Sequence, residues 1–282
     1  AERIAKADIV ITNKVRIGKR ELAAAARLKL IIVAATGYDI IDVEAAQQNG
    51  VAIANSPGYS LSSLPEHAVG LMFAVARSIV PFARAASDGT WTQASTFCLH
   101  NWPIIELRGL VLGIIGSGSL GRATGKLCAA LGMRPIYLKR KQSPSSGGDD
   151  LKRLAWDELL ATCDIISLHC PLAPDNRHMF NGDAFAQMKN SAILINTARG
   201  ALVDAAALVA ALEDGQIAGA GIDVLDQEPP PATNPLISCS HPALVVTPHV
   251  AWASRQAQER LLDLIAATAD AFMRGQPQHL VA

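Results

Sequence analysis

The sequence has no excess of charge of either sign, since 25 Lys and Arg balance 25 Asp and Glu over 282 residues. A protein that binds the phosphate backbone of a nucleic acid is typically basic, so we expect no nucleic-acid partner. Long hydrophobic runs are also lacking, because the stretches at 28–35 and 68–76 fall well short of the roughly 20 residues that a membrane-spanning helix needs. We therefore expect no membrane partner.

Cysteine is scarce as well. The chain has five cysteines, at positions 98, 128, 163, 170 and 239, and none of them forms a CxxC pair. Such pairs are typical of zinc sites and redox centres, so we expect no bound metal. An odd number of thiols fits a reducing compartment better than a disulfide framework. The sequence therefore predicts a cytoplasmic protein with free thiols.

Apolar residues are abundant at 50% of the chain, which is enough for one large or two medium cores. Short β-branched runs alternate with Ala- and Leu-rich stretches. This alternation predicts an α/β fold with parallel sheets. The expected strands span 7–12, 28–36, 51–56, 110–115, 135–139, 164–169, 191–196 and 217–224, and the expected helices span 19–27, 42–50, 119–131, 156–162, 181–188 and 204–213.

Two long helices are expected to connect separate domains. The first spans 62–87, with Ser62 or Ser63 as its N-cap, and Pro81 should bend or break it. The second spans about 252–274. These crossovers predict two α/β domains with the second inserted into the first. The expected boundaries are 1–64 with 266–282 for one domain and 65–265 for the other.

A glycine-rich turn follows the strand at 110–115. Gly116, Gly118 and Gly121 have the spacing G-x-G-x-x-G, which permits a tight turn, close approach of a pyrophosphate, and packing of the next helix on the strand. The amides of Ser119 and Leu120 would face the anion. The alternative is a glycine turn that serves only packing. The strand–turn–helix context favours a dinucleotide-binding site.

Positive charge follows the next strand, where such sites usually have an acid that binds the ribose hydroxyls of NAD. Lys139 stands at that position and is followed by Arg140 and Lys141. Cations would attract the 2′-phosphate of NADP rather than repel it. The sequence thus predicts a preference for NADP, with NAD as the second possibility. Alternatively, these are solvated charges at a strand end.

Three polar residues are candidates for the chemistry. Arg199 follows a buried strand, where its forked guanidinium could bind a carboxylate, although a surface ion pair is the other interpretation. His249 follows another strand, and Glu228 lies in a loop stiffened by prolines. If Glu228 bonds one imidazole nitrogen, it favours the charged ring, and the other nitrogen can donate a proton.

Several motifs together resemble the D-isomer-specific 2-hydroxyacid dehydrogenase family. They include ATGYDIIDVEAAQQNGVAIANSPGYS, LGIIGSGSLGR, SLHCPLAPDNRHMF, NTARGALVD, GIDVLDQEPP and TPHVAWAS, in the family's order over nearly the whole chain. The stretch FCLHNWPIIELRG is most similar to the glycerate dehydrogenase, or hydroxypyruvate reductase, branch. The resemblance implies two Rossmann-like, doubly wound domains, one for the substrate and one, inserted into it, for the cofactor.

The resemblance also implies a role for each matched residue. Arg199, Glu228 and His249 would be catalytic, in the reduction of a small 2-keto acid such as glyoxylate or hydroxypyruvate by a nicotinamide cofactor. The amides of Ala35, Thr36 and Gly37 would bind the substrate carboxylate. Asp223 would bond the nicotinamide amide, and the cofactor would be lined by Cys170, Pro171, Thr197 and Ala198. A homodimer is implied, built partly by residues 88–108.

Two departures and two alternatives accompany this resemblance. The family's usual acid is replaced by Lys139, and the family has a strand and helix before the segment matching residue 1. We expect that residues preceding Ala1 supply them. A non-enzymatic, NAD(P)-sensing binding protein of the corepressor type could retain the same motifs. A phosphoglycerate-type dehydrogenase is the other alternative. Such an enzyme needs hydrogen-bond donors in its substrate domain that bind the phosphate group of the substrate.

Overall fold

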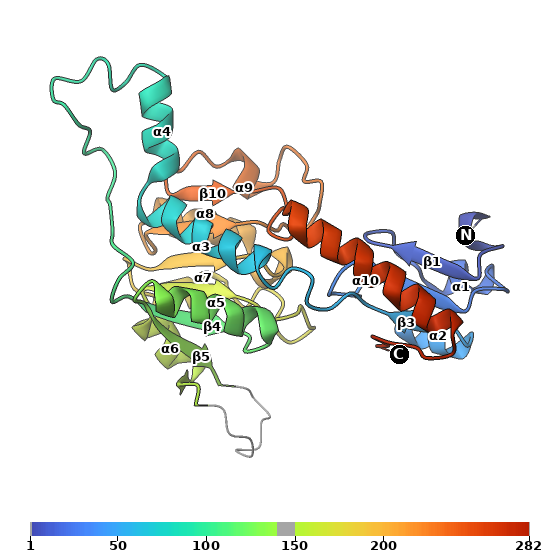
Figure 1. Ribbon diagram of the computed structural model, residues 1–282. Helices are drawn as coiled ribbons and strands as arrows, with labels where there is room; N and C mark the ends of the chain where they lie inside the picture. The colour runs from blue at the N-terminus through green and yellow to red at the C-terminus, as the bar shows by residue number, and fades with distance from the viewer. Residues whose placement is uncertain (1, 140–149, 282) are drawn as a thin grey trace. The chain divides into compact units, whose positions relative to one another are not determined.

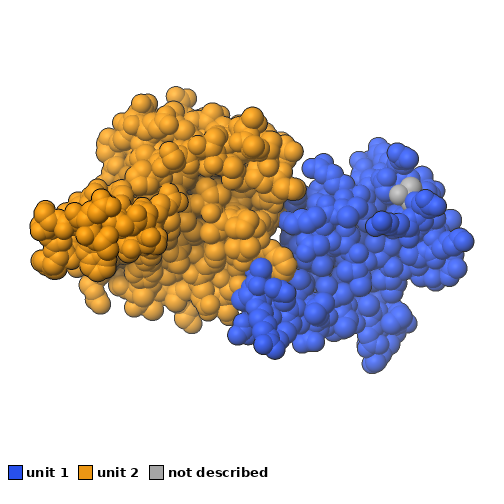
Figure 2. Space-filling model, turned by 90° about the horizontal axis from the view of Figure 1, so that it is seen from above, with its two compact units in different colours: residues 1–60, 253–282 blue, residues 61–252 orange. Residues whose placement is uncertain are grey.

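The computed structural model describes residues 2–139 and 150–281. It separates into two compact units, Ala1–Ser60 with Ala253–Ala282, and Leu61–Trp252 (Figure 2). The chain leaves the first unit once and returns to it, so the second unit is an insertion. The boundary expected at 265/266 lies inside the last helix, α10 (Arg255–Met273), all of which belongs to the first unit.

The first unit contains a parallel sheet of three strands in the order β1-β2-β3. Its middle strand is fully buried, because Leu30–Val33 is apolar on both faces. The elements are β1 (Ile9–Thr12), α1 (Lys19–Ala23), β2 (Leu30–Val33), α2 (Val43–Gln48), β3 (Ala52–Ala54) and α10, with a short 3-10 turn at Glu2–Ile4. The Asp42 side chain accepts from the Ala45 amide and caps α2.

The second unit contains a parallel sheet of seven strands in the order β10-β9-β8-β7-β4-β5-β6. Its strands are β4 (Val111–Ile115), β5 (Arg134–Leu138), β6 (Arg153–Leu154), β7 (Ile165–Leu168), β8 (Ile193–Asn196), β9 (Gly219–Ile222) and β10 (Leu244–Val246). Its helices are α3 (Ser63–Ala76), α4 (Ile79–Ser87), α5 (Ser119–Ala130), α6 (Trp156–Thr162), α7 (Gly182–Gln187), α8 (Ala205–Glu213) and α9 (Pro235–Ser238) (Figure 1).

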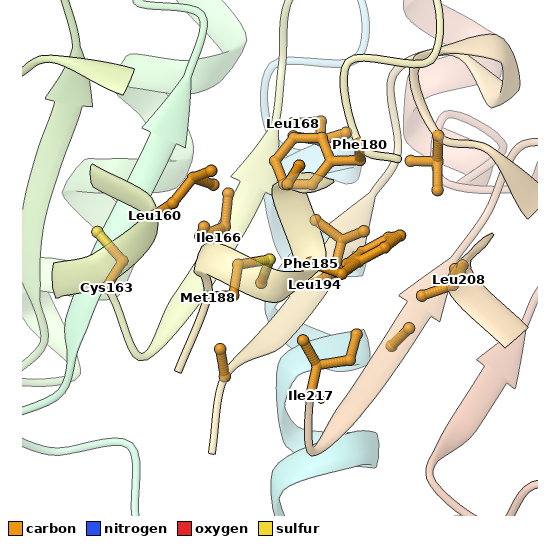
Figure 3. Packing of buried hydrophobic residues seen from close by; sticks show 14 of the residues in the cluster. Leu160, Cys163, Ile166, Leu168, Phe180, Phe185, Met188, Leu194, Leu208 and Ile217 are labelled. Carbon is orange, nitrogen blue, oxygen red and sulfur yellow. The ribbon is translucent and has the colours of Figure 1, made fainter. Parts of the chain in front are cut away.

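Two apolar cores cover opposite faces of this sheet. One core includes Phe180, Phe185 and Leu208 and lies under α6, α7 and α8 (Figure 3). The other includes Met72 and Tyr137 and lies under α3 and α5. Because both faces are covered, the central strands β4, β7 and β8 are buried along their whole length and are mostly apolar. The prediction of a doubly wound α/β fold is confirmed.

The long helix expected at 62–87 breaks earlier than predicted. It divides at Arg77 and Ser78 into α3 and α4, which are bent by 64°. Ser78 has a left-handed backbone with φ of 49°, and its hydroxyl donates to the Pro103 carbonyl at 2.7 Å. Pro81, expected to cause the break, lies in the first turn of α4, where the missing amide costs nothing.

A helix that crosses a membrane must be both long and apolar. Among the described residues, no single helix meets both conditions, whereas the bent pair α3 and α4 meets them when its two parts are taken together. In α3 the apolar residues face the core of the second unit, since Met72 and Leu71 are buried there.

Candidate active site

The carboxyl edge of the seven-stranded sheet collects segments that are far apart in the sequence. All neighbouring strands of this sheet pair in parallel, so their carboxyl ends share one edge. Ligands of open α/β sheets bind at that edge. The residues that follow successive strands across it are His249 after β10, Asp223 after β9, Arg199 after β8, His169 after β7, Gly116 after β4 and Lys139 after β5.

Glycine is required at two positions of the turn after β4. Gly116 has φ of 107°, and an added Cβ would lie 2.5 Å from the backbone of His169. At Gly121 a Cβ would lie 1.9 Å from the Gly116 carbonyl oxygen. At Gly118, in contrast, a Cβ would meet nothing within 4 Å. The turn thus leaves open space beside Ser119 at the first turn of α5, where an anion fits.

A second observation supports a dinucleotide at this edge. The Thr197 hydroxyl, just after β8, is buried, and among the described residues it has no hydrogen-bond partner. Buried polar groups rarely remain unpaired unless a ligand or water satisfies them. Its neighbour Ala198 donates from its amide to Asn196, whose side-chain amide donates to the Arg199 carbonyl. The Asn196 side chain thus orders the loop, and the residues present fit a nicotinamide cofactor.

The Arg199 turn lies directly against the loop that carries Glu228. A Cβ on Gly200 would lie 2.0 Å from the Leu225 carbonyl carbon and 2.3 Å from the Asp226 amide nitrogen. Only glycine permits two backbones to come so close. The Arg199 guanidinium donates to the Ala198 carbonyl at 2.8 Å. The two loops are therefore adjacent, as the neighbouring positions of β8 and β9 require.

Glu228 and His249 are paired. The distance from His249 Nδ1 to Glu228 Oε2 is 2.6 Å, and the other carboxylate oxygen accepts from the Leu225 amide at 2.8 Å. Both side chains remain partly exposed, at 25% for His249 and 30% for Glu228. Because Nδ1 faces the carboxylate, Nε2 is the nitrogen that can transfer a proton. The contact predicted from the sequence is present.

His249 adopts an unusual backbone conformation, which hydrogen bonds to the carbonyl and the carboxylate of Asp223 stabilise. The φ angle of His249 is 54°, a left-handed value that is uncommon for residues other than glycine. The Asp223 carbonyl accepts from the His249 amide at 2.7 Å. The Asp223 carboxylate accepts from the Thr247 hydroxyl at 2.6 Å and from the amides of Val250 and Ala251 at 3.0 Å each.

His67, on α3, completes this network. Its Nε2 lies 3.0 Å from the Thr247 hydroxyl and 3.3 Å from an Asp223 oxygen. Burial by itself raises the pKa of Asp223, but hydrogen bonds from His67, Thr247 and two amides outweigh it and hold the pKa below its usual value. Asp223 is therefore a carboxylate at neutral pH, and its bonds hold the loop that presents His249.

His169 and Cys170 follow β7 beside the glycine turn. Burial lowers the pKa of His169 to about 4, so its ring is neutral at physiological pH and pairs with the Ser167 hydroxyl at 2.9 Å. Burial raises the pKa of the Cys170 thiol to about 11. A neutral imidazole and a protonated thiol suit the wall of a cofactor site better than acid–base work. The place of Pro171 in that wall stays a prediction.

The basic cluster is described only in part. Lys139 is exposed at the end of β5, whereas Arg140 and Lys141 lie outside the described residues. A cation that the sequence did not indicate lies nearby: Arg153 of β6 donates to the Ser117 hydroxyl at 3.2 Å. Its strand has two residues, too few to produce a periodic pattern. Only the pairing of β6 with β5 reveals it.

The loop expected to bind the substrate carboxylate belongs to the first unit and follows β2. Asn55 donates to the Thr36 carbonyl at 2.8 Å, and the Ser56 amide donates to the Ala35 carbonyl at 3.0 Å. Within the described part of the chain, the amides of Ala35, Thr36 and Gly37 donate to no acceptor. These three donors suit a carboxylate. Among the described residues, no group of three or more His, Cys, Asp or Glu side chains could hold a metal ion.

A family model matches most of the second unit. Residues 69–251 match the D-isomer specific 2-hydroxyacid dehydrogenase, NAD binding domain. A glycerate dehydrogenase from Methylorubrum extorquens is 45% identical over 280 residues, which cover 99% of this chain and 87% of that protein. A hydroxypyruvate reductase from Blautia hydrogenotrophica is 34% identical over 279 residues, covering 99% of this chain and 86% of that protein.

The solved structures contain the same fold. An acyclic imino acid reductase in complex with NADPH and D-Arg superposes with a TM-score of 0.88 at 30% identity, covering 100% of this chain and 87% of that chain. Similarity over both units, rather than over one motif, distinguishes this match from a shared glycine turn.

Proposed function

This chain belongs to the D-isomer specific 2-hydroxyacid dehydrogenase family, and from that premise we propose that it reduces hydroxypyruvate and glyoxylate with NADPH as its preferred hydride donor. Hydride transfer between a nicotinamide cofactor and a small 2-hydroxy acid is the activity of the family. The proposal adds the substrate, the cofactor preference and the residues. The pairing of His249 with Glu228 at 2.6 Å is the observation that carries the assignment of the proton donor.

His249 is the proposed general acid. Reduced nicotinamide, when bound, supplies the hydride that adds to C2 of the 2-oxo acid. The electrons of the C=O bond move to oxygen, which takes the proton held at Nε2 of the imidazolium. Glu228 pairs with Nδ1 and so fixes the orientation of the ring, which leaves Nε2 to face the substrate. The product is the 2-hydroxy acid, and the ring is left neutral.

Arg199 is the proposed electrophile and substrate anchor. It lies beyond the carboxyl end of β8, on a turn that Gly200 holds against the Glu228 loop. Its guanidinium would bind the substrate carboxylate and polarise the reacting carbonyl. The amides of Ala35, Thr36 and Gly37 are proposed to donate to a carboxylate of the substrate. Ala1–Ser60 with Ala253–Ala282 would then be the substrate domain, and Leu61–Trp252 the cofactor domain.

The proposed cofactor contacts extend along the sheet edge. Gly116, Gly118 and Gly121, with the amides of Ser119 and Leu120, would hold the pyrophosphate. Thr197, Ala198, Cys170 and Pro171 would line the nicotinamide half, where the buried Thr197 hydroxyl supplies a donor. Asp223 would accept from the nicotinamide amide in addition to holding the His249 loop. Lys139 would face the ribose, and its charge favours NADPH over NADH. Arg140, the other residue proposed for this role, lies outside the described residues.

The substrate assignment is supported by the relatives. Two of them are named for glycerate and for hydroxypyruvate, and they align over nearly all of this chain. Glyoxylate is the smaller 2-oxo acid of the same class and needs no additional pocket. Arg199 and the amides after β2 recognise a carboxylate, a feature that all 2-oxo acids share, so the preference among them depends on the side-chain pocket.

A homodimer is the proposed assembly. A long loop follows α4 (Figure 1). Apolar side chains are exposed on α4 and on this loop, among them Ile79 at 50%, Trp91 at 51% and Phe97 at 90%. Exposed apolar groups gathered on one projecting segment mark an association surface. Trp102, which lies in the segment 88–108, packs edge-on against Phe82 with ring centroids 5.0 Å apart.

One panel of assays tests the proposal. Hydroxypyruvate, glyoxylate, pyruvate and phosphohydroxypyruvate would each be assayed with NADPH and with NADH. We expect the highest kcat/KM for hydroxypyruvate with NADPH. A preference for phosphohydroxypyruvate would favour the phosphoglycerate-type enzyme instead, and a preference for NADH would overturn the cofactor assignment. Binding of NADPH without turnover of any of the four acids would favour the sensing protein.

A further inference from the structure

We propose that Arg153, on the edge strand β6, binds the 2′-phosphate of NADP(H) and so determines cofactor preference. This inference rests on the proposed function, because it assigns part of the NADPH preference to one described side chain. Nothing in the glycine motif or in the cluster after β5 points to it, since Arg153 lies 14 positions beyond Lys139 in the sequence.

The strand pairing brings Arg153 to the cofactor edge. β6 pairs in parallel with β5, with Tyr137 opposite Arg153 and Leu138 opposite Leu154. The Lys139 amide donates to the Leu154 carbonyl at 2.8 Å and extends that pairing past the end of β5. Arg153 therefore lies beside the last residues of β5, which is the strand end where the adenosine ribose binds in folds of this kind.

The Arg153 side chain then crosses the end of β5 toward the glycine turn. Its Nη1 donates to the Leu138 carbonyl at 3.3 Å and to the Ser117 hydroxyl at 3.2 Å. Leu138 ends β5, and Ser117 lies between Gly116 and Gly118. The guanidinium thus spans the two strand ends between which the ribose 2′-position is expected, at the same edge as Lys139.

The chemistry of this position suits a phosphate dianion. A guanidinium has several donors in a planar fork that matches phosphate oxygens, and Arg153 is only partly buried. A second arginine, Arg122 of α5, donates from Nε to the Ser117 carbonyl at 2.9 Å. Positive charge at the ribose stabilises the 2′-phosphate of NADP and gives no comparable advantage to the hydroxyl of NAD.

A purely structural role makes a different prediction. If Arg153 only braced Ser117, its loss would weaken both cofactors equally, because the pyrophosphate contacts of the turn are common to both. A 2′-phosphate ligand would weaken only the phosphorylated one. The two roles are therefore separable by comparing a ligand that has the 2′-phosphate with one that lacks it.

The experiment measures binding of 2′,5′-ADP and of 5′-AMP to the intact chain by isothermal titration calorimetry, without turnover. For Arg153→Gln we expect the Kd for 2′,5′-ADP to rise about tenfold to a hundredfold, the range typical of a lost charge-assisted hydrogen bond. The Kd for 5′-AMP should change less than about twofold, and Arg153→Lys should restore part of the difference. Retained 5′-AMP binding also shows that the variant is folded.

Arg134→Gln is the matched control. Arg134 begins β5 at the opposite, amino edge of the sheet and donates to the Gly109 carbonyl at 3.0 Å. Arg134→Gln removes the same charge as Arg153→Gln, but it should leave the Kd values for 2′,5′-ADP and for 5′-AMP unchanged. The control separates a local contact from a general loss of positive charge.

Each outcome decides one of the two proposals. If wild type prefers 2′,5′-ADP and Arg153→Gln loses that preference, the assignment to Arg153 is supported. If the variant keeps the preference, or weakens both ligands equally, Arg153 is not the phosphate ligand, while the proposed NADPH preference stands. If wild type has no preference, the NADPH assignment and the role of Arg153 are both wrong, and hydroxypyruvate reduction is unaffected.

Discussion

His249 illustrates how much depends on single residues. Its left-handed backbone conformation costs roughly 1 to 2 kcal/mol for a residue with a side chain. Asp223 offsets that cost with one carbonyl and two carboxylate oxygens bonded to the segment 247–251. This conformation directs the His249 ring toward Glu228. One of the strained residues is thus the residue proposed to donate the proton.

Replacing His249 by Gln is expected to lower kcat/KM for hydroxypyruvate by about a hundredfold to ten-thousandfold, since the proton donor is removed. Steady-state kinetics with NADPH would measure the loss. His241→Gln is the control, because His241 precedes β10 and lies away from the carboxyl edge. Near-normal turnover by the His249 variant would refute the assignment.

His169 makes stability depend on pH in a defined window. The pKa of His169 in the folded chain is about 4, below the ordinary 6.5, so the unfolded chain binds the additional proton as pH falls. The resulting loss in the free energy of unfolding is absent above pH 6.5 and grows as the pH falls toward 4. We expect His169→Gln to flatten this part of the pH dependence, by at most about 3 kcal/mol.

Urea unfolding of wild type and His169→Gln between pH 7 and 4 would test this effect. Equal slopes against pH would contradict the prediction. The carboxylate of Asp223 affects stability in a lower pH range. Because its folded-state pKa is depressed, its stabilisation is present above the ordinary value of 3.8 and is lost only as pH falls through the lower folded pKa.

At the scale of elements, the close contact between the loops after β8 and β9 sets the geometry of the site. Gly200→Ala would place a Cβ 2.0 Å from the Leu225 carbonyl carbon, so the two loops must separate. We expect kcat/KM to fall about a hundredfold, as a displacement of about 1 Å can cause. Thermal unfolding would show a parallel loss of stability.

Gly182→Ala is the control for this substitution. A Cβ on Gly182 would meet nothing within 4 Å, and Gly182 is the first residue of α7. Alanine is favoured over glycine in a helix, so this variant should be neutral or slightly stabilising. A Gly200 variant as active as the Gly182 variant would show that the loop contact does not position Arg199 and Glu228.

The element order was largely predictable, and the exceptions have physical reasons. Repeating apolar patterns identified strands such as β4 and helices such as α5 to within one or two residues, because a buried face must recur at the period of its element. The sequence predicts a break at Pro81, whereas α3 and α4 are divided at Arg77 and Ser78. Ser78 has no local signal, since its left-handed conformation is stabilised by a bond to the distant Pro103.

At the scale of the whole molecule, the proposed dimer gives a testable consequence. Phe97 is 90% exposed, so Phe97→Ser removes an apolar side chain that contributes nothing to the described core. We expect the variant to shift toward monomer at micromolar concentration while its thermal unfolding within the monomer is unchanged. Size-exclusion chromatography with light scattering would measure the mass.

Leu262→Ser is the matched control for the dimer test. Leu262 is also exposed, at 67%, but it lies on α10 and not on the segment after α4. Its substitution should leave the mass unchanged. A monomeric wild type, or a dimer insensitive to Phe97, would show that the exposed apolar segment serves another purpose.

The sequence by itself determined the α/β class, the parallel order of strands and helices, the glycine turn and the family. These properties follow from the spacing of residues that are near one another in the sequence and from short motifs, which can be identified without knowing any tertiary contact. It also singled out Arg199 and His249, because polar residues that follow strands must lie at one edge of a parallel sheet, and Glu228, because prolines stiffen the loop that carries it. Their catalytic roles remain predictions.

Only the tertiary structure decided which distant residues meet. The contacts of His67 with Asp223, of Gly200 with Leu225, and of Arg153 with Ser117 join segments that are 25 to 156 positions apart. No periodicity records such pairs, since strand order across the sheet differs from order along the chain. Packing of whole strands against one another, which is a property of the entire domain, brings them together.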